Sequence, residues 1–326
     1  MIGAYIDKSY VYAVARIRLM ELKLLSKHNF DELIVAKDKS NIKRILKEKD
    51  WGADEDADFL SIIKNERVKL WQFIDEIVPD REVFSVFDIS SEYHNLKAAI
   101  KESTLDFDYS DIYIDGATTP YSVIKSCIDN KAYGDLPSEM VEVAREAHEI
   151  LLKTGDGQLC DAMIDRKAIE EIEKKGLESK EKVIEMYAKL VAAAYNIKIS
   201  VRSALTNKDS DFMERAIADT TTIDRDLLIS ATQNGVDAIC NYLLTTDYSD
   251  AVPYIKKSLT AFEKWCDDLI IDRMRGMLYE SFGIGPVAAY ILAKEQEIKN
   301  LRIIYTGIAN GFSADMIRER VRDSYV

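Results

Sequence analysis

Pairs of aspartates are the residues in this sequence whose type and spacing best suit chemistry. Two groups contain pairs four residues apart: Asp161 with Asp165, and Asp268 with Asp272, the second group also including Asp267. Residues four apart share one face of a helix, so carboxylates from neighbouring helices can together hold a metal ion. Helical bundles that bind two iron ions in this way also use Glu-x-x-His motifs, and this chain has none. We therefore expect Arg166 and Arg273, which directly follow the two groups, to balance their charge.

The histidines and cysteines do not form a recognisable catalytic or metal-binding pattern. His28, His94 and His148 are far apart, and the sequence contains no H-x-x-x-H or H-E-x-x-H motif. We expect His94 to serve in packing. The four cysteines are also well separated, without a C-x-x-C pair, and are expected to be small buried or half-buried residues: Cys127, Cys160, Cys240 and Cys266.

Glycine pairs are the remaining feature that could indicate a phosphate site. A Walker A loop requires Gly-x4-Gly-Lys-Ser/Thr after a strand, and this sequence lacks one. The pairs Gly155-Asp-Gly157 and Gly283-Ile-Gly285 follow helical segments and are interpreted as helix stops. The sequence therefore predicts no catalytic residue, no cofactor and no metal site.

Composition excludes several classes of partner. The net charge of -13 and the pI of about 4.9 oppose binding to nucleic acid or to an anionic lipid surface. No apolar run approaches the ~20 residues that a membrane-spanning helix needs. The N-terminal sequence MIGAYIDKSY lacks a signal-peptide core, so we expect the chain to remain in the cytoplasm.

Helices should make up nearly the whole chain, because only five prolines and 13 glycines interrupt its 326 residues. The expected helices cover residues 10–26, 30–49, 59–78, a segment from Ser90 or Ser91, a segment from Thr119-Pro120, 138–154, 160–175, 179–206, a segment from Thr222-Ile-Asp224, 253–276, a long helix from Pro286, and a short one from Ser313. Gly176, Gly307 and the Asn310-Gly311 pair are expected to end helices. In the long helix from Pro286, apolar residues recur at helical spacing, which places Lys294, Glu295, Lys299 and Arg302 on its polar side.

One short motif occurs in three of the long helices. The copies are Asn95-Leu96-Lys97, Asn196-Ile197-Lys198 and Asn300-Leu301-Arg302, spaced 101 and 104 residues apart. Each long helix is followed by a loop and a further helix, which we expect Thr119, Thr222 and Ser313 to cap. The spacing predicts three related helical modules, covering residues 1–112, 113–216 and 217–326. The N-terminal helix resembles the end of such a module, so the chain would close head to tail.

The repeated asparagines call for a physical explanation. Asparagine inside a helix costs roughly 0.5 kcal/mol relative to alanine. Its use at Asn95, Asn196 and Asn300 therefore predicts that each side chain forms hydrogen bonds with a neighbouring helix or loop. We interpret these positions, together with Lys97, Lys198 and Arg302, as structural repeat positions.

Four stretches together resemble a known family. They are YVYAVARIR at residues 10–18, EYHNLK at 92–97, AKEQEIKNLRII at 293–304 and RERVRDSYV at 318–326. The sequence is similar to the C subunit of bacterial and archaeal V-type (A-type) ATPases, which is called the d subunit in eukaryotes. The resemblance covers the whole chain. It departs at Gly283-Ile-Gly285-Pro286, where the family often has Gly-Pro-x-Pro, and this difference affects one loop.

The resemblance implies a fold and a role in a rotary motor. The family is an all-α funnel of three similar modules with pseudo-threefold symmetry, on the cytoplasmic face of the membrane. The funnel sits on the ion-carrying rotor ring of proteolipid subunits and receives the D and F subunits of the central shaft. Such a protein would be non-catalytic and would transmit torque for ATP-coupled transport of protons or sodium ions.

Two other functions remain open from the residues alone. A helical-repeat adaptor unrelated to the ATPase would bind peptides on a concave surface. A carboxylate-metal enzyme would use the aspartate groups. Purified protein distinguishes the three functions, because an adaptor would not bind a rotor ring and an enzyme would retain metal.

Overall fold

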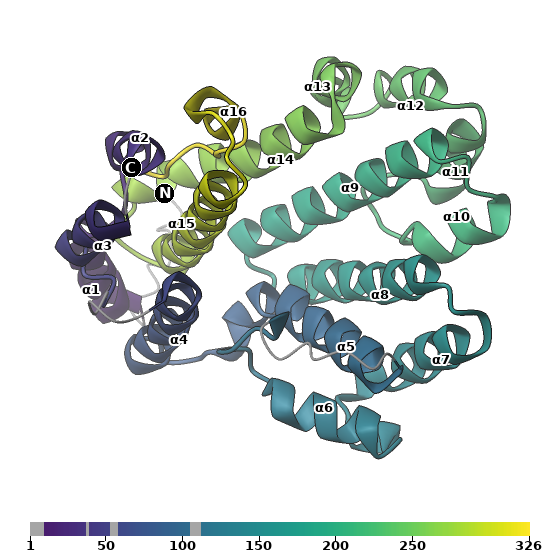
Figure 1. Cartoon of the computed structure of the whole chain (residues 1–326), viewed down its shortest axis with the longest axis horizontal. Helices are drawn as coiled ribbons and strands as arrows, with labels where there is room; N and C mark the ends of the chain where they lie inside the picture. The colour runs from purple at the N-terminus through teal and green to yellow at the C-terminus, as the bar shows by residue number, and fades with distance from the viewer. Residues whose placement is uncertain (1–9, 37–38, 53–57, 105–111) are drawn as a thin grey trace, which may run out of the picture. The chain divides into compact units, whose positions relative to one another are not determined.

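The protein is built from helices throughout its described residues (Figure 1). The computed structural model describes residues 10–36, 39–52, 58–104 and 112–326, and no strand occurs among them. This confirms the all-α fold class that the scarcity of glycine and proline predicts. Residues 1–9, in which we expect no signal peptide, lie outside the described part of the chain.

The helices belong to two compact units. Unit 1 comprises Met1–Glu82 and Lys264–Val326, and unit 2 comprises Val83–Glu263. Both ends of the chain therefore belong to unit 1. The expected module boundaries, after residues 112 and 216, both fall within unit 2, so the division into three modules stays a prediction.

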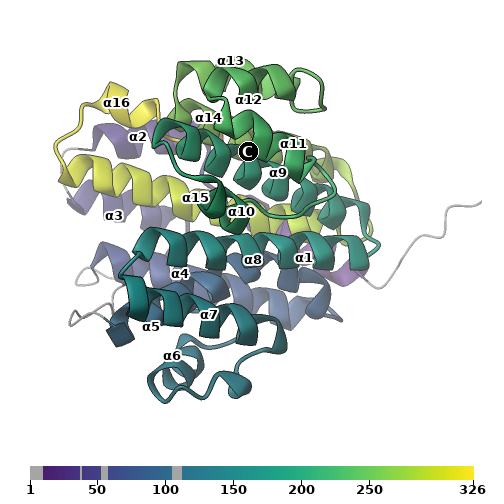
Figure 2. The ribbon, with the colours of Figure 1, turned by 90° about the vertical axis from the view of Figure 1, so that its right-hand side faces the viewer.

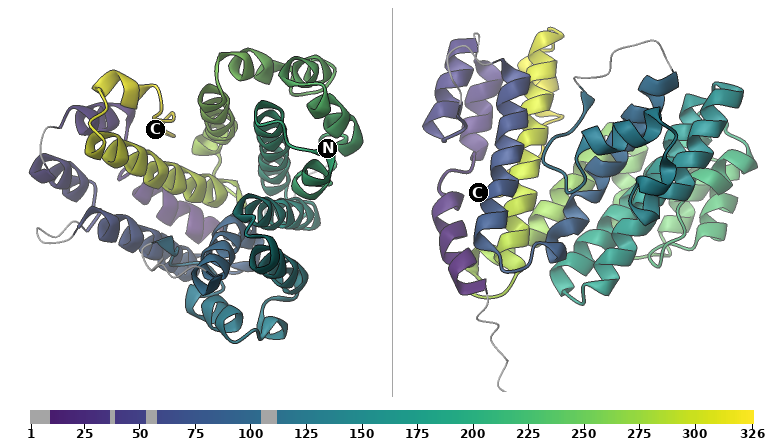
Figure 3. Two further views of the ribbon diagram at one scale, coloured as in Figure 1. Left: turned by 45° about the vertical axis from the view of Figure 1, so that its right-hand side comes forward. Right: turned by 90° about the horizontal axis from the view of Figure 1, so that it is seen from below.

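Unit 1 is arranged around one long helix, α15. Its α-helices are α1 (Val11–Glu21), α2 (Lys27–Val35), α3 (Lys39–Glu48), α4 (Phe59–Ile77), the end of α14 (Leu259–Met274), α15 (Gly285–Ala309) and α16 (Ala314–Arg318). Helices α1, α2 and α4 pack against α15 (Figure 3). Ile298, Leu301 and Ile304 of α15 enter a hydrophobic core with residues from α2, α3 and α4, and Tyr305 stacks on Phe59. The core thus joins residues 25–63 to residues 298–317, which are far apart in the sequence.

Unit 2 is arranged around α8. Its α-helices are α5 (Ile89–Thr104), α6 (Tyr121–Asp129), α7 (Ser138–Thr154), α8 (Gly157–Glu178), α9 (Lys182–Leu205), α10 (Ser210–Ala216), α11 (Arg225–Gln233), α12 (Val236–Leu243) and α13 (Val252–Lys257). Helix α8 packs against α5, α7, α9 and α10, and Figure 2 shows it between α7 and α10. Unit 2 also contains the short 3₁₀ helices η4 (Tyr133–Asp135) and η5 (Ser249–Ala251) and nearly all of η2 (Glu82–Phe87), whereas a fourth, η6 (Arg275–Tyr279), belongs to unit 1.

Several helix ends and helix caps differ from those expected. The expected helix over 10–26 ends at Glu21, and Ser26 caps α2 in a capping box with Asn29. Pro120, not Thr119, is the N-cap of α6, and Asp224, not Thr222, supplies the side-chain cap of α11. Of the three expected hydroxyl caps, only Ser313 at α16 is observed.

Other segments are divided differently from the prediction. The expected helix over 30–49 is two helices, α2 and α3, because Ala36 has extended backbone. The expected helix over 253–276 is likewise divided into α13 and α14 by extended backbone at Ser258. Short extended segments break a helix without glycine or proline, so the sequence signals for them are weak.

Gly176 and Gly307 lie inside α8 and α15, so the prediction that they end helices is wrong. Both positions permit close packing. A Cβ atom added at Gly176 would lie 2.3 Å from the Cβ atom of Ala188 in α9, and one at Gly307 would lie 2.7 Å from Cγ1 of Ile317 in α16. Glycine is retained at these places because only its backbone allows the neighbouring helix to approach so closely.

The Gly176→Ala variant tests this explanation. Alanine normally stabilises a helix relative to glycine, but here the clash with Ala188 should lower the free energy of unfolding by about 1–3 kcal/mol. Gly157→Ala is the matched control in the same helix, because its added Cβ atom meets no atom within 4 Å. Urea unfolding measures both variants. A Gly176→Ala variant as stable as the control would contradict the close-packing explanation.

Candidate functional site

Three buried asparagines make the same pair of hydrogen bonds. In each pair, Nδ2 donates to the main-chain carbonyl of a residue downstream and Oδ1 accepts from the N–H of that same residue. We name this arrangement the asparagine clamp. The clamps join Asn95 to Ile114 (2.9 and 2.8 Å), Asn196 to Ala218 (3.0 and 2.9 Å) and Asn300 to Arg322 (3.0 and 2.7 Å).

The clamp supplies hydrogen-bond partners for the main-chain N–H and C=O of one residue that lies outside the helices. All three asparagines are fully buried, and their downstream partners follow them along the chain by 19, 22 and 22 residues, beyond the ends of the long helices α5, α9 and α15. A primary amide offers one donor and one acceptor side by side, so it can pair with both groups of one residue. The side chains thus make the hydrogen bonds to neighbouring segments that the sequence predicts.

The basic residues of the repeated motif have different surroundings. The Lys97 ammonium pairs with Asp165 at 2.6 Å. Lys198 is half-buried, and Arg302 is exposed. The motif therefore places its asparagines alike, while each cation meets a local environment of its own.

Carboxylates extend the clamps by binding further main-chain N–H groups. Glu92 of α5 accepts a hydrogen bond from the N–H of Thr119 at 2.7 Å, and Glu297 of α15 accepts one from the N–H of Leu25. Both glutamates stand three residues before their asparagine. Ala193 occupies this position in α9, and Glu173 of α8 instead binds the N–H of Thr221 at 2.9 Å. The sequence gives no signal for Glu173, because this residue lies on a different helix from the motif.

The first aspartate group is neutralised by α5. Lys101 pairs with Asp161 at 2.7 Å and Lys97 with Asp165 at 2.6 Å. Arg166 instead binds Glu170 at 2.7 Å, so the expectation that it balances the aspartates is wrong. The side chain of Arg166 extends along its own helix, where Glu170 is one turn away.

The second aspartate group also meets cations. Asp267 accepts from Arg322 Nε at 2.8 Å and pairs with Lys299, while Asp268 pairs with Lys264 at 3.0 Å. Arg275, rather than the expected Arg273, pairs with Asp272. Burial raises the pKa of Asp268, against the opposing effect of its hydrogen bonds.

These ion pairs give the aspartates a structural role. Lysine and arginine occupy the positions next to the carboxylates that a cation would need. Within the described part of the chain, no group of three or more His, Cys, Asp or Glu side chains is arranged to hold a metal ion. The aspartates therefore connect α8 to α5, and α14 to α15 and the C-terminal segment.

A buried charge cluster lies at the centre of unit 1. The Lys294 ammonium is 2.7 Å from Glu66 and 2.9 Å from Glu297, and it lies 4.2 Å from the centre of the Trp51 ring. All these side chains are almost fully buried, so the prediction that Lys294 is on the polar side of its helix is wrong. Two counter-charges and an aromatic face compensate the ammonium for the water it loses.

The pKa values of this cluster follow from burial and charge. Burial by itself lowers the pKa of Lys294, but Glu297 and Glu66 together raise it above its ordinary value. Burial raises the pKa of Glu297, and the attraction of Lys294 offsets only part of this effect. Sequence analysis missed Glu66 and Trp51, because they approach Lys294 from distant parts of the chain.

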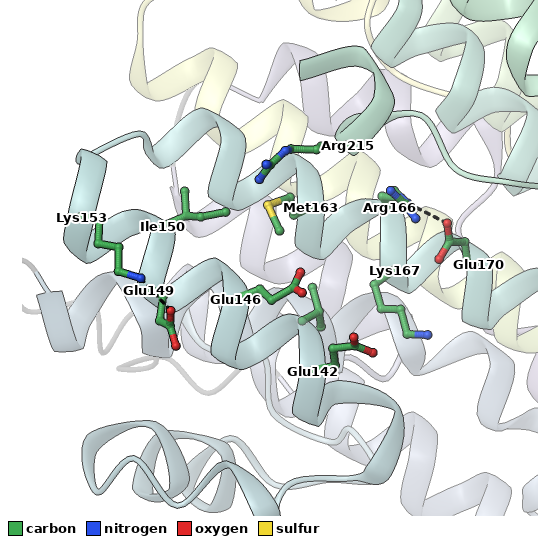
Figure 4. Close-up of a pocket in the computed structure, with 11 residues that line it drawn as sticks. Glu142, Glu146, Glu149, Ile150, Lys153, Met163, Arg166, Lys167, Glu170 and Arg215 are labelled. Atoms are coloured by element: carbon green, nitrogen blue, oxygen red, sulfur yellow. Dashed lines mark hydrogen bonds and ion pairs between the residues drawn. The ribbon is translucent and has the colours of Figure 1, made fainter. Parts of the chain in front are cut away.

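Unit 2 contains a cleft lined mainly by charged residues. It has a volume of about 530 Å³ and lies among α7, α8 and α10 (Figure 4). Its charged lining residues are Glu142, Glu146, Glu149, Lys153, Arg166, Lys167, Glu170 and Arg215. Lys153 pairs with Glu149 and Arg166 with Glu170. Four carboxylates and four cations line this cleft, together with Val143, Ile150 and Met163, and its lining as a whole is close to neutral.

His94 and His148 contact neighbouring groups within unit 2, whereas His28 is exposed and lies 3.8 Å from Glu32. His148 is buried, with its ring nitrogens 3.1 Å from Ser103 Oγ and 2.9 Å from Tyr133 OH, and burial lowers its pKa. Ser103 Oγ donates to the carbonyl of Ile100, which keeps its proton away from the imidazole. His94 binds the carbonyl of Ile112 at 2.8 Å. The four cysteines are buried or half-buried, as expected.

Removing one clamp should cost measurable stability. In Asn196→Ala, both main-chain groups of buried Ala218 lose their partner, and each unsatisfied group costs about 1–3 kcal/mol. Asn234→Ala is the control, because the exposed side chain of this residue, just after the end of α11, bonds the Ser230 carbonyl of that adjoining helix. Urea unfolding should show a loss of at least about 2 kcal/mol for Asn196→Ala and less than about 1 kcal/mol for the control. Equal losses would contradict the role assigned to the clamp.

The Lys294→Met variant tests the buried cluster. It leaves buried Glu297 without a counter-charge and Glu66 with only Lys69 at 3.8 Å, which should lower the free energy of unfolding by about 3–5 kcal/mol near neutral pH. Loss of Lys294 raises the pKa of Glu297 further, so Glu297 in the folded variant takes up a proton more readily than it does in the unfolded chain. The loss of stability relative to the wild type should therefore be smaller at about pH 5 than at about pH 7.5. Arg44→Met breaks an exposed pair with Glu48 and should cost less than about 1 kcal/mol. Denaturant midpoints at both pH values provide the measurement; a pH-independent defect would contradict the assignment.

No helix in the described ranges has both the length and the apolar character needed to cross a membrane.

Known proteins resemble this chain along nearly its whole length. The profile of the ATP synthase (C/AC39) subunit family matches residues 13–320. The C subunit of the V-type sodium ATPase from Enterococcus hirae is 28% identical, over 95% of this chain and 97% of that protein. The C subunits of the A-type ATP synthases from Methanocaldococcus jannaschii and Desulfurococcus sp. are 22% and 24% identical, over 95% of this chain and 85% and 90% of theirs. Together with the all-helical fold, the match across both units shows that the chain belongs to the ATP synthase (C/AC39) subunit family.

Proposed function

We propose that this protein is a non-catalytic central-stalk component of a rotary V-type ATPase, linking the central shaft to the membrane ion-carrying ring. The observation that carries the proposal is the family match over residues 13–320, which spans both units. The relatives are themselves named as C subunits of a V-type sodium ATPase and of A-type ATP synthases. The partners would be the D and F subunits of the shaft on one side and the proteolipid ring on the other.

The chain would be organised as three related modules, residues 1–112, 113–216 and 217–326, around an approximate threefold axis. The three asparagine clamps support this proposal. Asn95, Asn196 and Asn300 are 101 and 104 residues apart and make the same two bonds to segments at similar distances along the chain. Lys97, Lys198 and Arg302 would then occupy equivalent positions whose side chains have diverged.

The interior suits a part that transmits torque. A narrow shaft and a wide ring need an intermediate that holds both without slipping, and close-packed helices resist deformation. The clamps fasten the segments that follow three long helices, and the Lys294 cluster ties α15 to α4. Paired carboxylates connect neighbouring helices in this structure, which supports a structural role for them. The protein would work at the cytoplasmic face of the membrane and support transport of protons or sodium ions.

Vesicles reconstituted without this protein test the proposed function. The soluble head should still hydrolyse ATP, because its catalytic sites lie on other subunits, but ion pumping should be lost. A fluorescent indicator of the transported ion measures pumping, and phosphate release measures hydrolysis. Adding back the purified chain should restore pumping, whereas Asn196→Ala should restore it only at temperatures where that variant is folded. Coupled pumping at the normal rate in vesicles that lack the chain would refute the proposal.

A further inference from the structure

Helix α1 has an apolar outer face that the described part of unit 1 leaves uncovered. Ala13, Val14 and Ile17 are buried against the rest of unit 1, where α1 packs on α15 and α4. The exposed side also consists of apolar residues, which we name the α1 face: Val11, Tyr12, Ala15, Leu19 and Leu22. Leu19 and Leu22 are 65% and 74% exposed. A helix that is apolar on its outer face as well as on its buried face normally lies within an assembly, so a partner should cover this face.

The spacing places these residues on one side of the helix. Val11 and Leu22 are eleven residues apart, which is about three turns of a helix, and Tyr12 and Leu19 are seven residues apart, which is about two turns. Residues separated by whole turns lie on the same side of a helix. The right-hand view of Figure 3 shows α1, in dark purple, at the outer edge of unit 1. The α1 face is therefore a continuous strip along an outer helix.

The charges beside this strip are unusual for so acidic a chain. Residues 11–22 contain Arg16 and Arg18, and their only acid is Glu21, which is buried and bound by Arg18 at 2.6 Å. Arg16 bonds the hydroxyl of Tyr12 at 2.6 Å and Glu76 at 3.1 Å. The strip thus has arginines at its margins and no free carboxylate of its own, although the whole chain has a net charge of -13.

A neighbouring segment adds aromatic residues. Arg18 also donates to the main-chain carbonyls of Met277 and Glu280, which fastens α1 to the segment from η6 to α15. Tyr279, between these two residues, is 89% exposed, and Phe282 is also exposed. Arg18 therefore holds a second exposed apolar segment next to α1.

We propose that the α1 face, with Tyr279, docks on the rim of the membrane ion-carrying ring, an inference that rests on the proposed function. The rim of a membrane protein lies at the level of the lipid headgroups, where tyrosine and arginine are favoured. Anionic headgroups repel carboxylates, so an acidic protein must approach them through a surface without free acids. The α1 face combines apolar side chains, a tyrosine and flanking arginines and meets these requirements.

A binding assay with a charge substitution tests the inference. The full-length chain is mixed with proteoliposomes that contain the purified ring of the same ATPase, or with liposomes of the same lipids without protein, and binding is measured by flotation. The wild type should bind the ring vesicles and not the protein-free ones. Leu19→Glu/Leu22→Glu should bind on the order of 100-fold more weakly, because two apolar contacts become buried acids. Tyr279→Ser, on the other segment, should also weaken binding.

The control is Leu227→Glu/Leu244→Glu, which adds the same charge at leucines that are 56% and 57% exposed in unit 2. This variant should bind as the wild type does. All variants change exposed residues, and circular dichroism checks that each is folded. Equal binding of Leu19→Glu/Leu22→Glu and wild type would overturn this inference and leave the proposed function standing. If the wild type binds protein-free liposomes as well as ring vesicles, the partner of the α1 face is lipid and the inference about the ring is wrong. If the wild type does not bind ring vesicles at all, both this inference and the proposed function are wrong.

Discussion

Buried main-chain groups must find hydrogen-bond partners, and in this protein asparagine side chains meet that requirement where helices end. A segment that leaves a helix and crosses the interior exposes peptide groups to a medium without water. The amides of Asn95, Asn196 and Asn300 each pair with both groups of one such residue. The loops can consequently lie against the long helices instead of over the surface, which allows the neighbouring helices to pack.

The buried charges contribute positioning more than net stability. Lys294, Glu66 and Glu297 lose most of their hydration, and this cost is of the same order as the attraction gained, so replacing such a group with apolar residues is often neutral or stabilising. Removing only one partner lowers the free energy of unfolding, however, because the remaining charge is then buried without a counter-charge. The cluster therefore admits one arrangement of α4 and α15 and penalises others. Exposed pairs such as Arg44–Glu48 add little to this selection.

The sequence predicts features that depend on neighbours along the chain. The helical fold follows from scarce glycine and proline, and the asparagines can be recognised because polar residues inside helices need a partner. Features that depend on contacts between distant segments escape such reasoning. The periodicity of α15 predicts Lys294 on the polar side of the helix. In the structure this side chain is buried, because Glu66 and Trp51 contact it from distant parts of the chain. Gly176 has the sequence pattern of a helix stop, but its role is to permit close packing against Ala188 of α9. Arg166 directly follows the first aspartate group, but the lysines that pair with these aspartates are on α5.

Unit 1 is made from the two ends of the chain, and this has a consequence for synthesis on the ribosome. Residues 83–263 are contiguous, so unit 2 can form its contacts as soon as they have emerged. The core around Phe30, Leu33 and Ile62 needs Ile298, Leu301 and Ile304, which come late in translation. Asn300 in turn binds Arg322, four residues before Val326. A chain truncated before Ile298 therefore lacks part of this core, and unit 1 can complete its packing only after residues 298–322 have been made.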